Sequence, residues 1–381
     1  MTDSFDVIIV GLGAMGSATA WHLARRGRRV LGLEQFPAGH ALGSSHGESR
    51  IIREIYFEHP NYVPLVRRAY ELWRDLERES GARLLTITGG LMIGRTDGKL
   101  VSGVLRSAEA HDIPHEVLAA EEVNERFSGF ELRGDDVAVL DRRAGILDAD
   151  ACVRAQLDVA SRLGAALHFE EQVTAWASDG DHVRVETTRG RYVARQLVLS
   201  AGPWMSKLLP ALSSALVVER QVLAWFEPAT HSGQYESSRL PIYLWEYGGG
   251  HMGYGFPRLA SGVKAAVFHD GDVVRDPDAI QRSVEPHEIE RIRDALTHIL
   301  PGVASGALRD AKVCPFTNTP DTHFLIDFHP SFPNVLMSSP CSGHGFKFAS
   351  AVGEVQADLL TGGQSRFDIS LFQFDRFISN G

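Results

Sequence analysis

Three glycines near the N-terminus have the spacing of a dinucleotide-binding turn. Gly11, Gly13 and Gly16 form the pattern Gly-x-Gly-x-x-Gly between an apolar run and a helical pattern. The first glycine permits a tight turn, the second lets a pyrophosphate approach the backbone, and the third lets the helix pack on the strand. Glu34 ends the next apolar run, where a carboxylate accepts hydrogen bonds from ribose hydroxyls. An acid there disfavours a 2′-phosphate, so the pattern predicts FAD or NAD rather than NADP.

Basic residues are concentrated in one short segment of an acidic chain. Residues 45–53 run Ser-His-Gly-Glu-Ser-Arg-Ile-Ile-Arg and contain His46, Arg50 and Arg53. Two arginines three positions apart can converge on one anion if the segment is helical or tightly turned. A solvated basic face is an equally good interpretation of this segment taken alone.

A second glycine loop, near the C-terminus, offers another anion site. Residues 342–348 run Ser-Gly-His-Gly-Phe-Lys-Phe, and a helix is predicted from about residue 346 onward. Free N–H groups and the positive end of the helix dipole would then face an anion. A reduced flavin carries such a charge, which a site of this kind stabilises. Glycine loops before helices are common, so the segment supports the dinucleotide prediction without deciding it.

The elements predicted around these residues alternate between strand and helix. Residues 5–10 and 30–33 are short apolar runs typical of buried strands, and residues 14–26 between them have helical spacing. Such a unit requires a parallel strand pair and a right-handed crossover. Residues 183–187 and 192–193 alternate between apolar and polar side chains, which predicts a hairpin.

The strand and glycine-loop pattern returns later in the chain, which indicates a domain assembled from separated segments. We therefore predict an α/β fold with two domains. The Rossmann-like, dinucleotide-binding domain comprises residues 1–84, 147–216 and 318–381, and a mixed β-sheet substrate domain comprises residues 85–146 and 217–317.

The composition argues against several classes of protein. The chain has 381 residues, of which 44% are hydrophobic and 23% are charged, as in ordinary globular proteins. A net charge of −10 makes nucleic acid and anionic membranes unexpected partners, and no apolar stretch approaches a membrane span. Three widely spaced cysteines predict neither a disulfide framework nor a metal site. Together with an N-terminus unlike a signal peptide, they favour a cytoplasmic location.

Four segments together resemble the monomeric sarcosine oxidase / N-methyltryptophan oxidase family, whose members are FAD-dependent oxidases of N-methyl amino acids. They are the turn at Gly11, residues 45–53, residues 342–348, and residues 314–321, which run Cys-Pro-Phe-Thr-Asn-Thr-Pro-Asp. Residues 197–204 resemble the second flavin-contact segment of amino-acid oxidase-like flavoproteins, which favours FAD over NAD. The resemblance spans nearly the whole chain and makes the Rossmann-like domain an FAD-binding domain.

The reaction that the resemblance implies is oxidation of the C–N bond of a secondary amino acid such as sarcosine. A hydride passes to the flavin, the imine is hydrolysed to an aldehyde and an amino acid, and O2 is reduced to H2O2. The implied partners are a small-molecule amine and O2, and a monomer is expected. The family cysteine that matches Cys314 carries the flavin as an 8α-thioether, and Lys312 could help to ionise it. Without the resemblance, Cys314 would be interpreted as a buried apolar cysteine.

The resemblance also implies roles for basic and aromatic side chains. Arg53 and Lys347 would clamp the substrate carboxylate, Tyr254 and Phe316 would contact the substrate, and Lys264 would activate O2. The implied catalytic residues are Lys264, Arg50, His46, Tyr254 and His269. The implied cofactor-binding residues are Gly11, Gly13, Ala14, Met15, Gly16, Glu34, Ser45, Arg50, Val173, Ala201, Gly202, Trp204, Cys314, Gly343, His344, Gly345, Phe346 and Lys347.

Three departures from the family pattern concern the substrate side. His269 lies one position further from Lys264 than the active-site histidine of the sarcosine-oxidising members, and Phe268 takes that place. Phe316 replaces a tyrosine that lines the substrate pocket. The dipeptide Pro-Cys at 340–341 precedes the glycine loop, where glycine and an apolar residue are usual.

Two further interpretations of the function stay open. One is oxidation of a cyclic imino acid such as pipecolate or proline, or of a larger secondary-metabolite amine, which Trp245, Tyr247 and Tyr254 would suit. The other is a flavin dehydrogenase that passes electrons to a different acceptor, or a dinucleotide-binding module without turnover.

Overall fold

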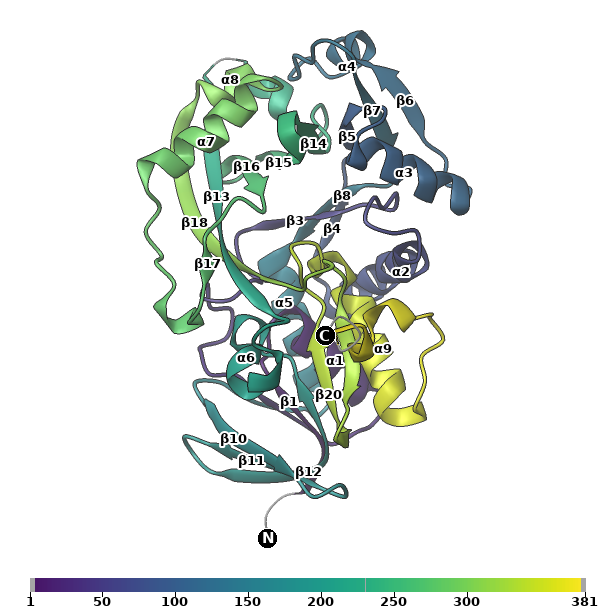
Figure 1. Ribbon diagram of the computed structural model, residues 1–381, viewed down its shortest axis with the longest axis vertical. Helices are drawn as coiled ribbons and strands as arrows, with labels where there is room; N and C mark the ends of the chain where they lie inside the picture. The colour runs from purple at the N-terminus through teal and green to yellow at the C-terminus, as the bar shows by residue number, and fades with distance from the viewer. Residues whose placement is uncertain (1–3, 230, 378–381) are drawn as a thin grey trace.

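Two large sheets, with a small sheet between them, organise the chain (Figure 1). The computed structural model describes residues 4–229 and 231–377. In Figure 1 the first sheet lies in the lower part of the molecule, near the N-terminus, and the second sheet lies in the upper part. Both are α/β layers, as the sequence predicts.

The first sheet has eight strands and contains the predicted strand–helix–strand unit. Strand β1 (Ser4–Val10) pairs in parallel with β2 (Val30–Leu33), and helix α1 (Ala14–Arg25) connects them. The other strands are β9 (Ala166–His168), β10 (Val173–Ser178), β11 (Val183–Thr187), β12 (Arg191–Leu199), β19 (Leu325–His329) and β20 (Phe332–Ser339). Strand β12 is parallel to β1 and β20, and β11 and β12 form the predicted hairpin.

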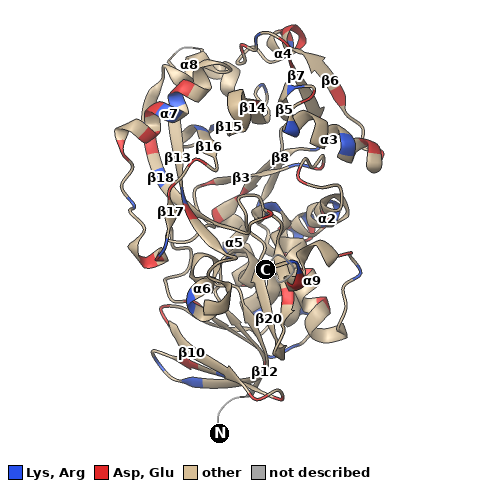
Figure 2. Cartoon of the chain, viewed as in Figure 1, with Lys and Arg blue, Asp and Glu red and all other residues tan. Residues whose placement is uncertain are grey.

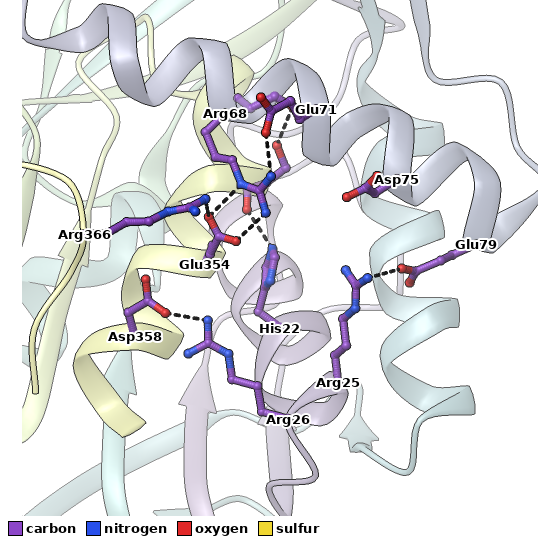
Figure 3. Close-up of polar contacts among 12 residues, drawn as sticks. His22, Arg25, Arg26, Arg68, Glu71, Asp75, Glu79, Glu354, Asp358 and Arg366 are labelled. Atoms are coloured by element: carbon purple, nitrogen blue, oxygen red, sulfur yellow. Dashed lines mark hydrogen bonds and ion pairs between the residues drawn. The ribbon is translucent and has the colours of Figure 1, made fainter. Parts of the chain in front are cut away.

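Four helices of 12 or more residues accompany this sheet: α1, α2 (Tyr62–Ser80), α5 (Ala149–Arg162) and α9 (Ala349–Gly362). Polar contacts tie three of them together (Figure 3). Arg68 on α2 donates to both carboxylate oxygens of Glu354 on α9, at 2.9 and 2.7 Å. His22 on α1 is buried, and its Nε2 lies 2.8 Å from the Ser350 carbonyl oxygen of α9. Helix α1, which follows the glycine turn, is thereby fixed in place.

The second sheet has nine strands and is mixed. Strand β14 (Ile242–Tyr247) is parallel to β5 (Gly90–Arg95), whereas the other neighbouring strands are antiparallel. The remaining strands are β6 (Glu116–Ala119), β7 (Asp136–Asp141), β13 (Val217–Glu227), β15 (His251–Leu259), β16 (Gly262–Phe268), β17 (Val273–Val274) and β18 (Ala307–Asn318).

The helices of this half have 12 residues or fewer. They are α3 (Lys99–Ala110), α4 (Ala120–Arg126), α7 (Pro286–Thr297) and α8 (Pro301–Ala304), and α6 (Met205–Leu208) follows β12 in the other half. Helix α7 ends at Thr297. The residue before a proline is biased away from helical backbone, so the chain breaks ahead of Pro301 and a new short helix begins there.

A small antiparallel sheet joins the two halves. It consists of β3 (Ser49–Ile52), β8 (Gly145–Asp148) and β4 (Leu85–Ile87). The basic segment therefore enters a strand, with Arg50 inside β3 and Arg53 one residue beyond its end. The binding of one anion by both arginines stays a prediction.

Basic and acidic residues are both spread over the outer helices and loops of the two halves (Figure 2). Within residues 4–229 and 231–377, no helix combines the length and the apolar character needed to cross a bilayer.

Candidate active site

A cavity of about 240 Å³ lies between the first and second sheets. Val10, Leu33 and Ser200, at the carboxyl ends of β1, β2 and β12, line one side. Ligands of open parallel sheets bind at this edge. Strands β13, β14, β15, β16 and β18 of the second sheet line the other side.

Most residues predicted for the site meet at this cavity. Those that line it are Gly11, Gly13, Ala14, Met15, Glu34, Ser45, Arg50, Arg53, Val173, Ala201, Gly202, Trp204, Tyr254, Cys314, Phe316, Gly343, His344, Gly345, Phe346 and Lys347. Four predicted residues do not: Gly16, His46, Lys264 and His269.

The glycine turn has the geometry that a diphosphate requires. Gly11 has φ +89°, and a Cβ on it would lie 2.5 Å from the Ser200 carbonyl oxygen. A Cβ on Gly16 would lie 1.8 Å from the Gly11 carbonyl oxygen, so only glycine permits this approach of helix and strand. Helix α1 begins without a side-chain cap at Gly13, although Ser45 Oγ accepts from the Ala14 N–H at 3.0 Å. The open helix N-terminus fits an anion.

Glu34 is held where a ribose would lie. Its carboxylate accepts hydrogen bonds from the Leu12 N–H at 2.9 Å and from the Phe36 N–H at 3.2 Å. Burial raises its pKa. Two carboxylate oxygens have about four acceptor sites, so capacity remains for ribose hydroxyls. The residues present therefore fit a dinucleotide such as FAD.

Cys314 lies at the cavity beside a guanidinium group. Its Sγ is buried and accepts from Arg50 Nη2 at 3.3 Å. Lys312, the neighbour expected to assist it, is half-exposed and pairs with Asp310 at 3.2 Å. The structure therefore places Arg50, rather than Lys312, in contact with the sulfur.

Lys264 is a fully buried cation behind the cavity wall. Its Nζ donates to the carbonyl oxygens of Gly47 and Ser49, both at 2.8 Å, and does not reach solvent. The Nζ also lies 5.3 Å from the Trp225 ring centroid and 4.8 Å from that of Phe256. Burial lowers its pKa well below the usual value.

Lys347 is buried and lines the cavity. Its Nζ donates to the His344 carbonyl oxygen at 2.6 Å and to the Tyr56 hydroxyl at 3.4 Å. His344 Nε2 lies 2.9 Å from the Thr322 carbonyl oxygen, and its Nδ1 lies 2.7 Å from the Tyr56 hydroxyl. Burial, together with the charge of Arg53, lowers the pKa of Lys347 to about 7.

Arg53 is already paired. It donates to both carboxylate oxygens of Glu58, at 2.7 and 2.6 Å, and to the Ile55 carbonyl oxygen at 2.9 Å. Burial raises the pKa of Glu58, but Arg53, His344 and Lys347 oppose this, and the net pKa lies below its usual value. Glu58 also lines the cavity, and only its contact with Arg53 in the folded chain reveals its role.

Aromatic rings form the wall of the second sheet. The ring centroids of Phe268 and Phe316 are 5.7 Å apart, and the Tyr254 ring lies 6.0 Å from that of Phe268. A Cβ on Gly343 would lie 2.8 Å from both phenylalanine rings.

His269 packs against the Phe268 and Phe316 rings, with centroids 4.2 and 5.7 Å away, but does not line the cavity. Its Nδ1 lies 3.0 Å from Glu219 Oε2, and its position gives no support to a catalytic role. His269 follows the last residue of β16 and has φ +54°, so it does not continue the strand.

His46 is buried close to Arg50 and Lys264. Neither of its ring nitrogens has a hydrogen-bond partner in the part of the chain that the structure describes. Burial, with the charges of Arg50 and Lys264, lowers its pKa to about 3, so its ring is neutral near pH 7.

The fold and the cavity define a dinucleotide-binding enzyme with a separate substrate sheet. The chain matches the model of the FAD dependent oxidoreductase family over residues 6–359. It therefore belongs to the FAD dependent oxidoreductase family, and FAD is its cofactor.

Its relatives agree with the predicted resemblance, which is confirmed. The chain is 45% identical to a monomeric sarcosine oxidase of Streptomyces avermitilis, over 98% of this chain and 97% of the relative. It is 33% identical to an N-methyl-L-tryptophan oxidase of Yersinia pestis, over 98% and 99% of the two chains. Among solved structures, NikD, described as an unusual amino acid oxidase essential for nikkomycin biosynthesis, aligns with a TM-score of 0.84. It shares 28% identity, and the alignment covers 98% of each chain.

Proposed function

We propose that this FAD-dependent oxidoreductase oxidises secondary N-methyl amino acids such as sarcosine, with O2 as electron acceptor. The names of the relatives support this substrate class. For an N-methyl substrate the balance is R–NH–CH3 + O2 + H2O giving R–NH2 + CH2O + H2O2. FAD, when bound, accepts a hydride from the substrate and returns the two electrons to O2.

One observation carries the proposal: a buried ammonium lines the cavity opposite an aromatic wall. Lys347 forms no ion pair among residues 4–229 and 231–377, and its charge suits the carboxylate of an amino acid. Arg53 can share this carboxylate if it exchanges its partner Glu58 for the substrate. Tyr254 and Phe316 then bound the amine side.

The remaining polar residues are assigned to the cofactor and to O2. We place His46 and Arg50 beside the flavin ring and Lys264 in the reaction with O2. Cys314 is proposed to carry FAD covalently, as an 8α-thioether. Its support is a buried sulfur at the cavity with a guanidinium nitrogen 3.3 Å away.

The three cysteines are free, as expected for a cytoplasmic protein. We propose that the enzyme acts there as a monomer, in keeping with the name of its relatives.

A larger or cyclic amine is the second candidate, and the aromatic wall favours it. Phe268 and Phe316 offer the substrate apolar rings with no hydrogen-bonding group. Such a surface gains more from an apolar substituent than from the bare methylene of sarcosine.

A panel assay tests both candidates. Purified enzyme is given sarcosine, N-methyltryptophan, proline and pipecolate, and H2O2 and formaldehyde are measured. Equal amounts of the two products from an N-methyl substrate support the first candidate. H2O2 without formaldehyde, from the cyclic substrates alone, would establish the second. Flavin reduction by substrate without H2O2 in air would refute the oxidase.

A further inference from the structure

A strained turn lies next to the buried Lys264. The Ser49 N–H donates to the Gly47 carbonyl oxygen at 2.8 Å, which closes a three-residue turn around Glu48. Glu48 has φ +68°, and Gly47 before it has φ +93°. A γ-turn with positive φ at its centre is rare and strained for a residue with a side chain. Such strain persists only where the surrounding structure enforces it.

Four hydrogen bonds hold Glu48 in this conformation. Its N–H donates to Asp150 Oδ2 at 3.0 Å, and its carbonyl oxygen accepts from the Ala149 N–H at 3.1 Å. Its carboxylate reaches the second sheet, where Oε2 accepts from Trp225 Nε1 at 2.8 Å and Oε1 accepts from the Ser261 N–H at 3.3 Å. Glu48 therefore ties the strand that carries the basic segment to the sheet that carries Lys264.

The turn aims two carbonyl groups at one ammonium. The carbonyl oxygens of Gly47 and Ser49, on either side of Glu48, each accept from Lys264 Nζ at 2.8 Å. Trp225, which Glu48 binds, is also the cross-strand partner of Lys264 in the β13–β16 pair. Its ring lies 5.3 Å from Nζ. One carboxylate thus organises the groups that surround the ammonium on two sides.

We propose that Glu48 is a positioning residue for Lys264, holding the strained turn and Trp225 so that the ammonium stays at a fixed point behind the cavity. The inference rests on the proposed role of Lys264 in the reaction with O2. A fixed cation needs no reorganisation when negative charge develops beside it, whereas a mobile one does. Loss of Glu48 should therefore affect the O2 half-reaction while sparing the reaction with the amine.

Glu48 also contributes its charge. Burial lowers the pKa of Lys264 most, Arg50 lowers it further, and Cys314, Glu48 and Asp150 oppose them. Without the Glu48 charge, the Lys264 ammonium should therefore lose its proton at lower pH. A role confined to packing would leave this pH profile unchanged.

Three substitutions in the FAD-loaded enzyme separate side chain, charge and strain. Glu48→Gln keeps an acceptor for Trp225 Nε1 and removes the charge. Glu48→Ala removes the carboxylate hydrogen bonds to Trp225 and Ser261 but keeps a strained positive φ at position 48. Glu48→Gly removes the hydrogen bonds and the strain, because glycine adopts positive φ readily. Asp112, an exposed acid with φ +50°, supplies matched controls as Asp112→Ala and Asp112→Gly.

The measurements are stopped-flow rates of the two half-reactions, their pH profiles, and the thermal unfolding midpoint. We expect Glu48→Ala to slow reoxidation by O2 about tenfold, with reduction by substrate changed less than twofold. Glu48→Gly should unfold at a higher temperature than Glu48→Ala but reoxidise as slowly. Glu48→Gln should lose reoxidation activity at lower pH than wild type, and the Asp112 variants should match wild type in both half-reactions.

The outcomes distinguish this inference from the proposed function. If Lys264→Met slows reoxidation and the Glu48 variants do not, the positioning role is overturned and the role of Lys264 stands. If both half-reactions slow equally in the Glu48 variants, Glu48 is only structural and the inference is overturned. If Lys264→Met leaves reoxidation unchanged, the proposed role of Lys264 fails, and the inference fails with it.

Discussion

The two sides of the cavity are built by different means. On the first sheet, backbone geometry makes the site, because Gly11 and Gly16 approach other backbone atoms where no Cβ fits. On the second sheet, side chains such as Phe268, Phe316 and Cys314 make the site, and each depends on which face of its strand it occupies. The backbone side imposes glycine at fixed local spacing, whereas the side-chain side can change its chemistry at single positions without altering the fold. We therefore expect single changes in the aromatic wall to alter the second-sheet side of the cavity while the glycine turn is retained.

The strongest test of the backbone side is Gly16→Val. The Cβ would lie 1.8 Å from the Gly11 carbonyl oxygen, so helix α1 must move away from β1. We expect a protein that retains almost no FAD, as measured by the ratio of flavin to protein absorbance after purification. Gly362→Ala is the control, since no atom from outside its own helix and its chain neighbours lies within 4 Å of a Cβ at that position. Full FAD content in Gly16→Val would contradict the backbone account.

The next test concerns Cys314, the residue of the second sheet that is proposed to carry FAD covalently. Cys314→Ser should abolish covalent attachment while the glycine turn still binds FAD. Acid-precipitated wild-type protein should stay yellow and fluoresce in a denaturing gel, whereas the variant should release its flavin into the supernatant. Cys341→Ser, at the other cysteine lining the cavity, should retain the linkage. Complete release of flavin from the wild type would make Cys314 a packing residue.

These differences also explain what the sequence could predict. The strand–helix–strand unit around Gly11 and Glu34 could be predicted because the pattern of neighbouring residues determines these elements, whereas the role of the two residues in binding FAD stays a prediction. From its sequence alone, the segment with Arg50 and Arg53 could be helical or tightly turned, but Arg50 lies in a strand whose sheet also includes residues 85–87 and 145–148. No local pattern reports such partners.

Long-range contacts account for the other omissions. Glu58 gains its role only from its ion pair with Arg53, and Glu48 from bonds to Trp225 and Ser261 on another sheet. Positive φ at Glu48 is equally invisible in the sequence, since the residue type does not demand it. The displacement of His269 was noticed from its spacing, but only strand β16 shows that Phe268 faces the cavity instead.

Lys264 allows a comparison of two lysines over one ring. Lys264 and Lys312 lie 5.3 and 5.4 Å from the Trp225 ring centroid, but only Lys264 is buried, while Lys312 is half-exposed and paired with Asp310. Loss of one preorganised charge typically costs about 10²- to 10³-fold in rate. Lys264→Met should slow reoxidation of the reduced enzyme by about this factor in stopped-flow experiments, with anaerobic reduction changed far less. Lys312→Met should leave both rates unchanged, and equal slowing by the two substitutions would argue against a specific role.

Lys347 predicts a pH dependence on the substrate side. Burial and Arg53 lower its pKa to about 7, so its charge, and with it carboxylate binding, should decline as pH rises through that value. A charge-assisted hydrogen bond contributes roughly 1.5–3 kcal/mol, or about 10- to 100-fold in affinity. Acetate binding, followed by the flavin spectrum, should weaken by this factor in Lys347→Met and lose its dependence on pH between 6 and 8.

FAD content should not change. Tyr56→Phe, which removes one hydrogen bond to Nζ, should give a smaller loss, and equal affinity in all three proteins would exclude the carboxylate site.

The smallest effect is expected among the helices of the first sheet, where His22 connects α1 to α9. Burial lowers its pKa to about 3, whereas the ordinary value is 6.5, so between these values the unfolded chain binds a proton that the folded chain does not. Its contribution to stability is therefore complete above about pH 6.5 and declines as pH falls, by about 1.4 kcal/mol per pH unit.

His22→Gln keeps a donor for the Ser350 carbonyl oxygen but binds no proton. Its thermal unfolding midpoint should lie below that of wild type at pH 7.5, and the gap should narrow steadily toward pH 5. His182→Gln, at an exposed position, should follow the wild type throughout. If the difference between the two unfolding midpoints stays constant with pH, His22 acts through packing alone. Helix α1, which follows the glycine turn, would then be held without a titratable contact.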